Sequence, residues 1–294
     1  MKKFLKISSY CVGFTALSLI FQVVTMLAFT LFYYLLLMLP PIISGNPDGL
    51  ASIDINKVTQ DVLMPSYILS GVLTFFSAWA IHAIFKRKFF NRLSLNRTPS
   101  ILVSISFLLG IALQMPISFI MGLLESAGLA PDMFEQYADS IDALMNNQST
   151  FLLIISIGII APIIEEVIFR GLIFHLLKNN MPVCAALIIQ AALFGFAHLN
   201  LIQGSYAFAL GIIMGLSLVW SKSMYLPIAI HVGMNLMGVA LSQYGNALSD
   251  TTSMILLFVS SLLIPICIVY IYRKTKKNAI PVEDADDLIE MTKV

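Results

Sequence analysis

Three charged side chains lie inside one apolar stretch of the sequence. Glu165, Glu166 and Arg170 interrupt a run that reads "FLLIISIGIIAPIIEEVIFRGLIFHLL". A charge at the centre of a bilayer costs at least ~2.5–3.5 kcal/mol on insertion scales, so such residues normally face a protein interior and mark a site. On a helix, Glu166 and Arg170 are four residues apart and share a face, where they can pair. Glu165 is then the carboxylate without a local cation, and it is the candidate general base or acid.

Two histidines and an amide occur in the apolar segments that follow. His198 lies in "LFGFAHLN", and His231 lies in "IAIHVGMN" with Asn235 four residues later. If the chain turns near residues 180–181, the helical rise places Glu165 about 23 Å and His198 about 26 Å from that turn, at nearly the same depth. His231 and Asn235 come out shallower, at ~12 and ~18 Å from their own turn. The four groups are therefore predicted to form one site, with a poorer depth match for the last two.

The other two histidines and the cysteines carry no comparable signal. His82 and His175 lie at the ends of apolar segments, near lysines, and are assigned to the membrane interface. The three cysteines are dispersed, with neither a disulfide framework nor a CxxC metal motif, and are interpreted as small packing residues. They are Cys11, Cys184 and Cys267.

The elements that position these groups are predicted to be membrane-spanning helices. The 294 residues are 59% hydrophobic and 11% charged, whereas soluble domains are nearer half apolar and a quarter charged. A net charge of +1 gives no indication of nucleic-acid binding. We expect an all-α, polytopic transmembrane bundle of about eight spans with a polar intramembrane site. The predicted spans are residues 10–38, 62–85, 101–124, 150–177, 182–199, 204–220, 225–243 and 253–272.

The charges between the spans predict an orientation. The N-terminus, the loop 86–100 and the segment 273–277 are rich in lysine and arginine, whereas residues 41–61 and 125–148 are mainly acidic. Eight spans would place every basic segment on one face, and basic segments are cytoplasmic by the positive-inside rule. Both termini are then expected in the cytoplasm, and the protein in the plasma membrane.

The domain organisation is predicted to be simple. The apolar run after "MKKFLK" continues to about residue 38 without an A-x-A cleavage site, so we interpret it as a retained first span. Residues 1–272 form the transmembrane bundle, residues 150–240 are its motif-bearing core, and residues 273–294 form a charged cytoplasmic tail.

Three short motifs together resemble a known family. "EEVIFR" is an E-E-x-x-x-R motif, "FGFAH" is F-x-x-x-H, and "HVGMN" is H-x-x-x-N. Each alone is weak, but in this order, at membrane depth, they resemble the CPBP family (CAAX protease and bacteriocin-processing, or Abi) of intramembrane endopeptidases. That family includes the type II CAAX prenyl proteases. The resemblance covers residues from about 150 to 240.

The resemblance implies a role for each motif residue. Glu165 and His198 would activate a water molecule for attack on a peptide carbonyl. His231 and Asn235 would bind the developing oxyanion, as oriented donors do in other hydrolases. The residues expected to support this site are Glu166, Arg170 and Phe194, the last by shaping the cavity.

Metal dependence stays open at this stage. The family is often described as metalloproteases, and Glu165, His198 and His231 are ligand types that suit zinc or another divalent metal. The sequence has no H-E-x-x-H motif, and the same residues suffice as base and oxyanion donors. We expect no tightly bound metal.

The substrate and the exposed face also stay open. The resemblance implies a peptide or a prenylated protein as substrate, with CAAX-type processing, peptide processing or bacteriocin self-immunity as the biological role. The depth estimate places Glu165 and His198 nearer the external face, whereas a CAAX-type protease takes its substrate from the cytosol. The alternatives are a proton-coupled transporter, for which no inverted repeat is visible, and a non-catalytic immunity or binding protein.

Overall fold

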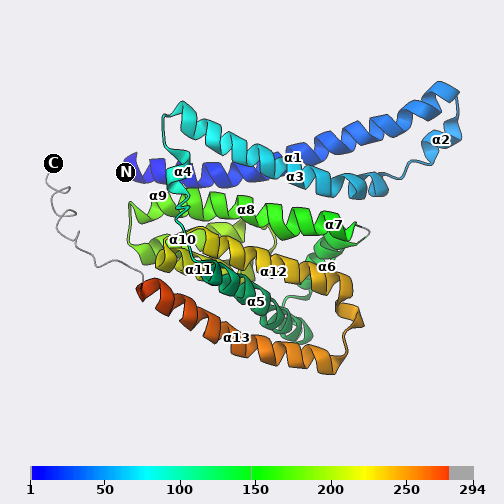
Figure 1. Ribbon diagram of the computed structural model, residues 1–294. Helices are drawn as coiled ribbons and strands as arrows, with labels where there is room; N and C mark the ends of the chain where they lie inside the picture. The colour runs from blue at the N-terminus through cyan, green and yellow to red at the C-terminus, as the bar shows by residue number, and fades with distance from the viewer. Residues whose placement is uncertain (1, 147, 278–294) are drawn as a thin grey trace.

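The computed structural model describes residues 2–146 and 148–277, and these residues form helices and connecting turns without a strand (Figure 1). This confirms the expected all-α bundle. The helices of the first half are α1 (Lys2–Ser44), α2 (Pro47–Ala51), α3 (Ile55–Ile84), α4 (Phe89–Arg92), α5 (Ser100–Ser126) and α6 (Pro131–Met145). Those of the second half are α7 (Thr150–Leu153), α8 (Ala161–Glu166), α9 (His175–Lys178), α10 (Val183–Phe196), α11 (Leu201–Ser221), α12 (Tyr225–Tyr244) and α13 (Asp250–Lys277).

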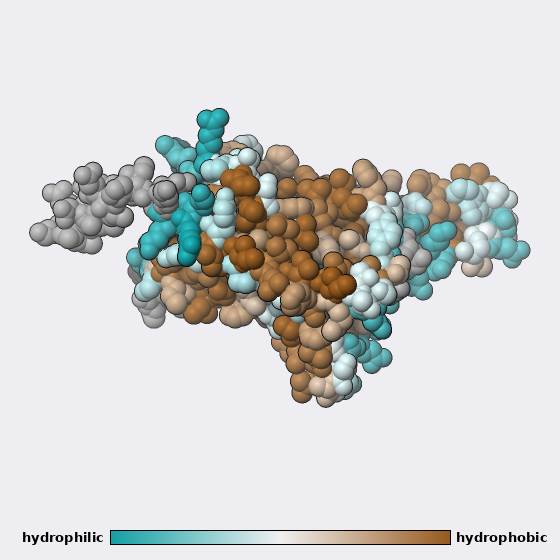
Figure 2. Space-filling view, turned by 60° about the horizontal axis from the view of Figure 1, so that its bottom comes forward, coloured by the Kyte–Doolittle hydropathy of each residue, from teal (hydrophilic) through white to brown (hydrophobic). Residues whose placement is uncertain are grey.

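The molecule is an integral, multi-pass membrane protein. Seven helices in the described part of the chain are long and apolar enough to cross a bilayer. Figure 2 shows the consequence on the surface: a broad apolar belt covers the middle, and hydrophilic residues gather at the two ends. Such a belt is what a bilayer-facing surface requires, because lipid cannot solvate polar groups.

One of the eight expected spans is shorter than predicted. We expected residues 182–199 to cross the membrane, but α10 ends at Phe196 and has 14 residues. At 1.5 Å per residue it is about 21 Å long, less than the ~30 Å hydrocarbon core. The chain then turns through Leu199, which adopts a positive φ of 54°, and Asn200 caps the start of α11 by accepting a bond from the Gln203 N–H at 3.0 Å. α10 and α11 therefore form a hairpin whose turn carries His198.

The helix that carries the acidic pair lies at the centre of the bundle. α7, α8 and α9 are parts of one continuous span, Thr150–Lys178, joined by two π-helical stretches, η1 (Ile154–Ile160) and η2 (Val167–Phe174). Pro162 follows η1 and cannot donate a backbone hydrogen bond to the preceding turn, which is a common cause of such irregularity. Every residue of η2 is buried. Glu165 and Glu166 lie between the two π-helical stretches, a type of backbone often found at functional sites.

Glycines allow the surrounding helices to approach closely. A Cβ on Gly110 of α5 would collide with the carbonyl oxygen of Ile230 on α12. In the α10–α11 hairpin, a Cβ on Gly195 would lie 2.5 Å from the carbonyl oxygen of Gly204. Small residues at such crossings are the usual means of helix association in lipid. They bring α5 against α12 and α10 against α11.

The basic and acidic segments lie at opposite ends of the bundle. Figure 1 shows the N-terminus, α4, α9 and the C-terminal end of α13 together at one end, and α2 and α6 toward the other. The expected charged tail began at residue 273, but α13 continues to Lys277, and residues 278–294 lie outside the described part of the chain.

Candidate active site

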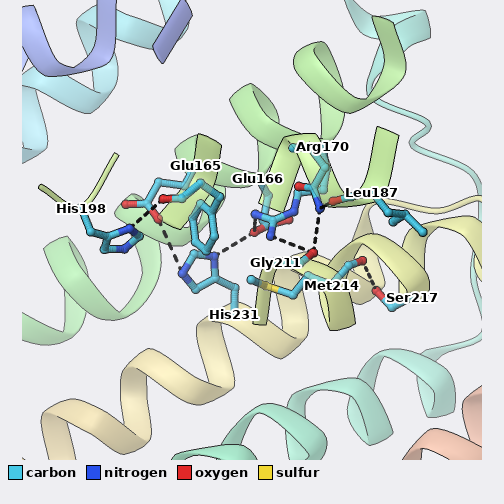
Figure 3. A network of polar contacts seen from close by, with 11 residues as sticks. Glu165, Glu166, Arg170, Leu187, His198, Gly211, Met214, Ser217 and His231 are labelled. Carbon is cyan, nitrogen blue, oxygen red and sulfur yellow. Dashed lines mark hydrogen bonds and ion pairs between the residues drawn. The ribbon is translucent and has the colours of Figure 1, made fainter. Parts of the chain in front are cut away.

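The pair predicted from the sequence, Glu166 and Arg170, forms a buried ion pair (Figure 3). Arg170 Nη1 lies 2.6 Å from Glu166 Oε1, and neither side chain is exposed. The guanidinium also lies over the ring of Phe194, 4.3 Å from its centre. Burial of an unpaired charge would be costly, so the pairing is what permits two ionised groups here.

Arg170 is joined to the α10–α11 hairpin through one backbone carbonyl. The Gly211 oxygen accepts from Arg170 Nη2 at 3.5 Å and from the buried amide Nε2 of Gln190 at 2.8 Å. Gly211 has no room for a side chain, because a Cβ there would lie 2.8 Å from the Cβ of Ala191. The ion pair therefore links the central span to the neighbouring hairpin.

His231 lies between the two glutamates. Its Nδ1 is 2.9 Å from Glu166 Oε1, so Glu166 holds both Arg170 and His231, and its Nε2 is 3.6 Å from Glu165 Oε2. The first distance is a hydrogen bond in which Nδ1–H donates to the carboxylate, and the second is longer than one. The Nε2 atom is left facing Glu165.

The poorer depth match predicted for His231 has a structural explanation. The depth of His231 was counted from the turn before α12, on the assumption that this turn lies at the membrane surface. Instead, Ser223 in that turn is fully buried, and the segment before α5 covers it. Thr98 Oγ1 bonds to Ser223 Oγ at 2.7 Å, and the Met224 N–H donates to the Ser94 carbonyl at 3.1 Å. The helix therefore starts below the surface, which brings His231 to Glu165.

His198 reaches the site because α10 ends early. It lies two residues past the helix, and its Nδ1 is 2.9 Å from the carbonyl oxygen of Phe194. A carbonyl only accepts, so Nδ1 donates and Nε2 of the neutral ring is free to accept a proton. The ring packs edge-on against Phe194, 5.0 Å between centres. Phe194 also contacts His231 edge-on at 5.6 Å, so it holds both imidazoles in place.

Asn235 is anchored by half of its amide. Its Nδ2 donates to the carbonyl oxygen of Ile157 in η1 at 2.9 Å. An amide nitrogen carries two hydrogens, so one donor remains for a ligand. The residue lines the same cavity as His231 and Glu165.

Two adjoining cavities meet at Glu165. One, of about 370 Å³, extends toward α6 and is lined by Glu165, His198, His231 and Asn235. The other, of about 220 Å³, lies between α1, α3 and α8 and shares Glu165 and His198 with the first. Glu165 retains 23% exposure of its side chain, whereas Glu166 has none. A small molecule or peptide that enters either cavity therefore meets Glu165 first, while Glu166 is accessible only to protein groups.

Two polar residues at the site lie outside the motifs and were not predicted from the sequence. Tyr67 of α3 lies beside Glu165 and lines both cavities. Gln190 of α10 is fully buried and holds the Gly211 carbonyl that Arg170 contacts. Gln190 could have been found as an amide in an otherwise apolar segment. Tyr67 has no such signal, because a tyrosine is common in membrane helices and α3 is distant in sequence.

The residues do not form a metal site as they stand. Within residues 2–146 and 148–277, no three histidine, cysteine, aspartate or glutamate side chains converge closely enough to hold an ion. Both nitrogens of His231 are directed at glutamates, and Nδ1 of His198 is bonded to the backbone.

The sequence comparisons agree with the motifs. Residues 147–237, which include every motif residue, match the family model for type II CAAX prenyl endopeptidase Rce1-like proteins. The chain is 32% identical over 90 residues to the membrane-embedded CAAX protease MroQ of Staphylococcus aureus (strain USA300), covering 29% of this chain and 36% of that protein. It is 33% identical over 88 residues to the putative membrane peptidase YdiL of Bacillus subtilis (strain 168), covering 30% of this chain and 36% of that protein.

The likeness is confined to the motif-bearing part of the chain. The matched region spans 36% of the length of each of these relatives, about a third. No solved structure matches. The resemblance to this group of membrane peptidases is confirmed for residues 147–237, and α1, α3, α5 and α13 lie outside the matched part.

Proposed function

We propose that this protein is an intramembrane endopeptidase that hydrolyses a peptide bond with a water molecule activated by Glu165 and His198. The observation that carries the proposal is the arrangement at the shared wall of the two cavities. The partly exposed carboxylate of Glu165 lies there beside the imidazole of His198, whose Nε2 is free. The same carboxylate is 3.6 Å from Nε2 of His231. A base next to oriented donors is what addition of water to a carbonyl requires.

The chemistry can be assigned to named atoms. Glu165, assisted by His198 Nε2, takes a proton from the water, whose oxygen bonds to the peptide carbonyl carbon. The carbonyl oxygen becomes an oxyanion that accepts from His231 Nε2–H and from the free N–H of Asn235. The proton held at Glu165 then passes to the peptide nitrogen, the oxyanion re-forms a carbonyl as the C–N bond breaks, and the products are a carboxylic acid and an amine.

The buried charges are consistent with His231 acting as a donor. Because Nδ1–H donates to Glu166, a proton at Nε2 requires the imidazolium form. The imidazolium and Arg170 would then balance Glu165 and Glu166, two cations against two carboxylates. Buried charges are tolerated when they are paired in this way. Tyr67, beside Glu165, would hold the carboxylate in position.

The substrate class is proposed from the membrane location and from the relatives. A peptide segment or a prenylated C-terminus would reach a site buried in the bundle, and MroQ is a membrane-embedded CAAX protease. The curated relatives are aligned over only a third of their length, so the substrate of this chain is a proposal as well.

The test is direct cleavage by protein purified in detergent. A farnesylated CAAX peptide and a library of unmodified peptides are incubated with wild type, Glu165→Gln, His198→Ala and, as a matched control, Asp250→Asn at the exposed start of α13, outside both cavities. We expect loss of ~10²–10⁴-fold in kcat for the two site variants, the usual value of general acid–base catalysis, and wild-type rates for the control. A site variant that cleaves at the wild-type rate would refute the assignment of the base.

The two kinds of substrate distinguish a CAAX-type protease from a peptidase without a prenyl requirement. Cleavage of the farnesylated peptide alone establishes CAAX-type specificity. Cleavage of unmodified peptides retains the peptidase and excludes a prenyl requirement. If neither substrate is cleaved by well-folded protein, the endopeptidase proposal fails and a binding or immunity role takes its place.

A further inference from the structure

A cavity unrelated to the glutamate site lies at the basic end of the bundle. Its volume is about 820 Å³. It lies between the first turns of α1, the end of α3 and the end of the central span at Leu176. None of its lining residues belongs to the three sequence motifs.

The charge lining this cavity is entirely positive. Lys3 and Lys6 come from α1, and Arg87 comes from the turn after α3. No carboxylate forms a salt bridge with any of them in the described part of the chain. The acidic residues described outside the central site lie in segments 48–61, 125–142 and at Asp250, on the connections at the other end of the bundle. Three neighbouring cations without counterions favour an anionic ligand.

The rim of the cavity is apolar and exposed. Leu5 is 56% exposed and Phe85 is 67% exposed, and Ile81 and Leu176 line the wall below them. A soluble anion would contact only the cations. An amphiphile would cover them with its chains while its headgroup contacts the cations, since basic pockets between helices at the cytoplasmic end are a common setting for acidic lipid headgroups.

The floor of the cavity is formed in advance by a hydrogen-bonded pair. The Tyr10 hydroxyl lies 2.8 Å from His82 Nε2, and His82 Nδ1 donates to the Ala78 carbonyl at 2.8 Å. His82 lies in the last turn of α3 and is 1% exposed, so it is buried within the protein at that end of the helix. The Phe14 and Phe89 rings pack around this pair. Binding would therefore require little reorganisation of the floor.

We propose that this cavity binds the headgroup of an anionic phospholipid, with Lys3, Lys6 and Arg87 against the phosphate and the rim at Leu5 and Phe85 against the acyl chains. The lipid would tie α1 to α3 and to the end of the central span. This binding site does not depend on peptide hydrolysis.

The experiment measures lipid binding to the delipidated full-length protein by native mass spectrometry and by thermal shift. The probes are phosphatidylglycerol, phosphatidylcholine and inorganic phosphate. The test variant is Lys3→Gln/Lys6→Gln/Arg87→Gln. The matched control, Lys222→Gln/Lys274→Gln/Lys276→Gln, removes the same charge from the same end of the bundle but from residues that do not line the cavity.

We expect phosphatidylglycerol to bind and stabilise the wild type and the control, and phosphatidylcholine to do neither. Each lost cation near a lipid surface weakens binding about 5-fold, so the test variant should bind roughly 100-fold more weakly. If the test and control variants lose phosphatidylglycerol binding equally, the proposal is overturned, because the lipid would then be attracted by the overall positive charge of this end and not by the cavity. Inorganic phosphate that stabilises as well as the lipid would overturn it in favour of a soluble anion.

Discussion

The buried residue on which the site most depends for stability is Arg170. It neutralises Glu166, contacts the ring of Phe194 and reaches the Gly211 carbonyl of α11. Replacement of Arg170 by alanine leaves the buried Glu166 carboxylate with His231 as its remaining partner. Removing one member of a buried ion pair costs ~3–5 kcal/mol of stability. We expect Arg170→Ala to unfold at a clearly lower temperature in detergent, measured by thermal unfolding.

A double variant distinguishes the effect of an unpaired buried charge from the effect of lost packing. Glu166→Gln/Arg170→Met removes both charges at similar volume, and such replacements are often close to neutral. It should therefore recover much of the stability lost in Arg170→Ala. If Arg170→Ala is as stable as the wild type, Arg170 is not a support of the site.

Metal independence is a prediction that belongs to the scale of single side chains. His231 and His198 each have a nitrogen bonded to the protein, and no three ligand types converge in the described residues. We expect proteolysis to persist after treatment with EDTA and 1,10-phenanthroline followed by gel filtration. Loss of activity restored by zinc would contradict this prediction and would identify Glu165, His198 and His231 as the candidate ligands.

At the scale of elements, the hairpin of α10 and α11 sets the position of His198. Gly195 and Gly204 allow the two helices to touch, and a Cβ on Gly195 would lie 2.5 Å from the backbone of its partner. Gly195→Ala should therefore separate the helices near His198, with a stability cost of ~1–3 kcal/mol for overpacking. Peptide cleavage by Gly195→Ala should fall further than the loss of stability alone would explain.

The matched control for this prediction is Gly122→Ala. Gly122 lies in α5 with nothing within 4 Å of an added Cβ. We expect it to keep both activity and thermal stability. Equal activity in the two variants, measured by peptide cleavage well below the unfolding temperature, would show that the close contact at Gly195 does not position His198.

At the scale of the whole molecule, the charges at its two ends predict which membrane face the site opens to. The larger cavity at Glu165 extends beneath α6, and it shares Ser118 with an adjoining cavity that Glu125 and Asp142 line. These residues are at the acidic end, which the positive-inside rule makes external. We therefore expect access from outside the cell.

Thiol labelling in intact cells tests this orientation. The background carries Cys184→Ser, because Cys184 is the exposed native cysteine and the other two are buried. A membrane-impermeant maleimide should label Ser118→Cys in intact cells, and should label Lys222→Cys at the basic end only after the cells are opened. The reverse pattern would place the site on the cytoplasmic side.

Local chemistry in the sequence was sufficient for much of this description. Membrane helices are recognisable from apolar length, because lipid excludes unpaired polar backbone. The Glu166–Arg170 pair follows from helical spacing, and the similar depth of Glu165 and His198 follows from the rise per residue. The three motifs lie within residues 147–237, the region that matches the family model.

Tertiary packing decided the rest. The early end of α10, the buried turn before α12 and the π-helical stretches around the glutamates depend on neighbouring helices, and they bring His231 and His198 to Glu165. Tyr67 comes from a helix outside the motifs, and the basic cavity is assembled from three segments distant in sequence. Hydropathy and spacing describe one helix at a time, whereas these features exist only where separate helices meet.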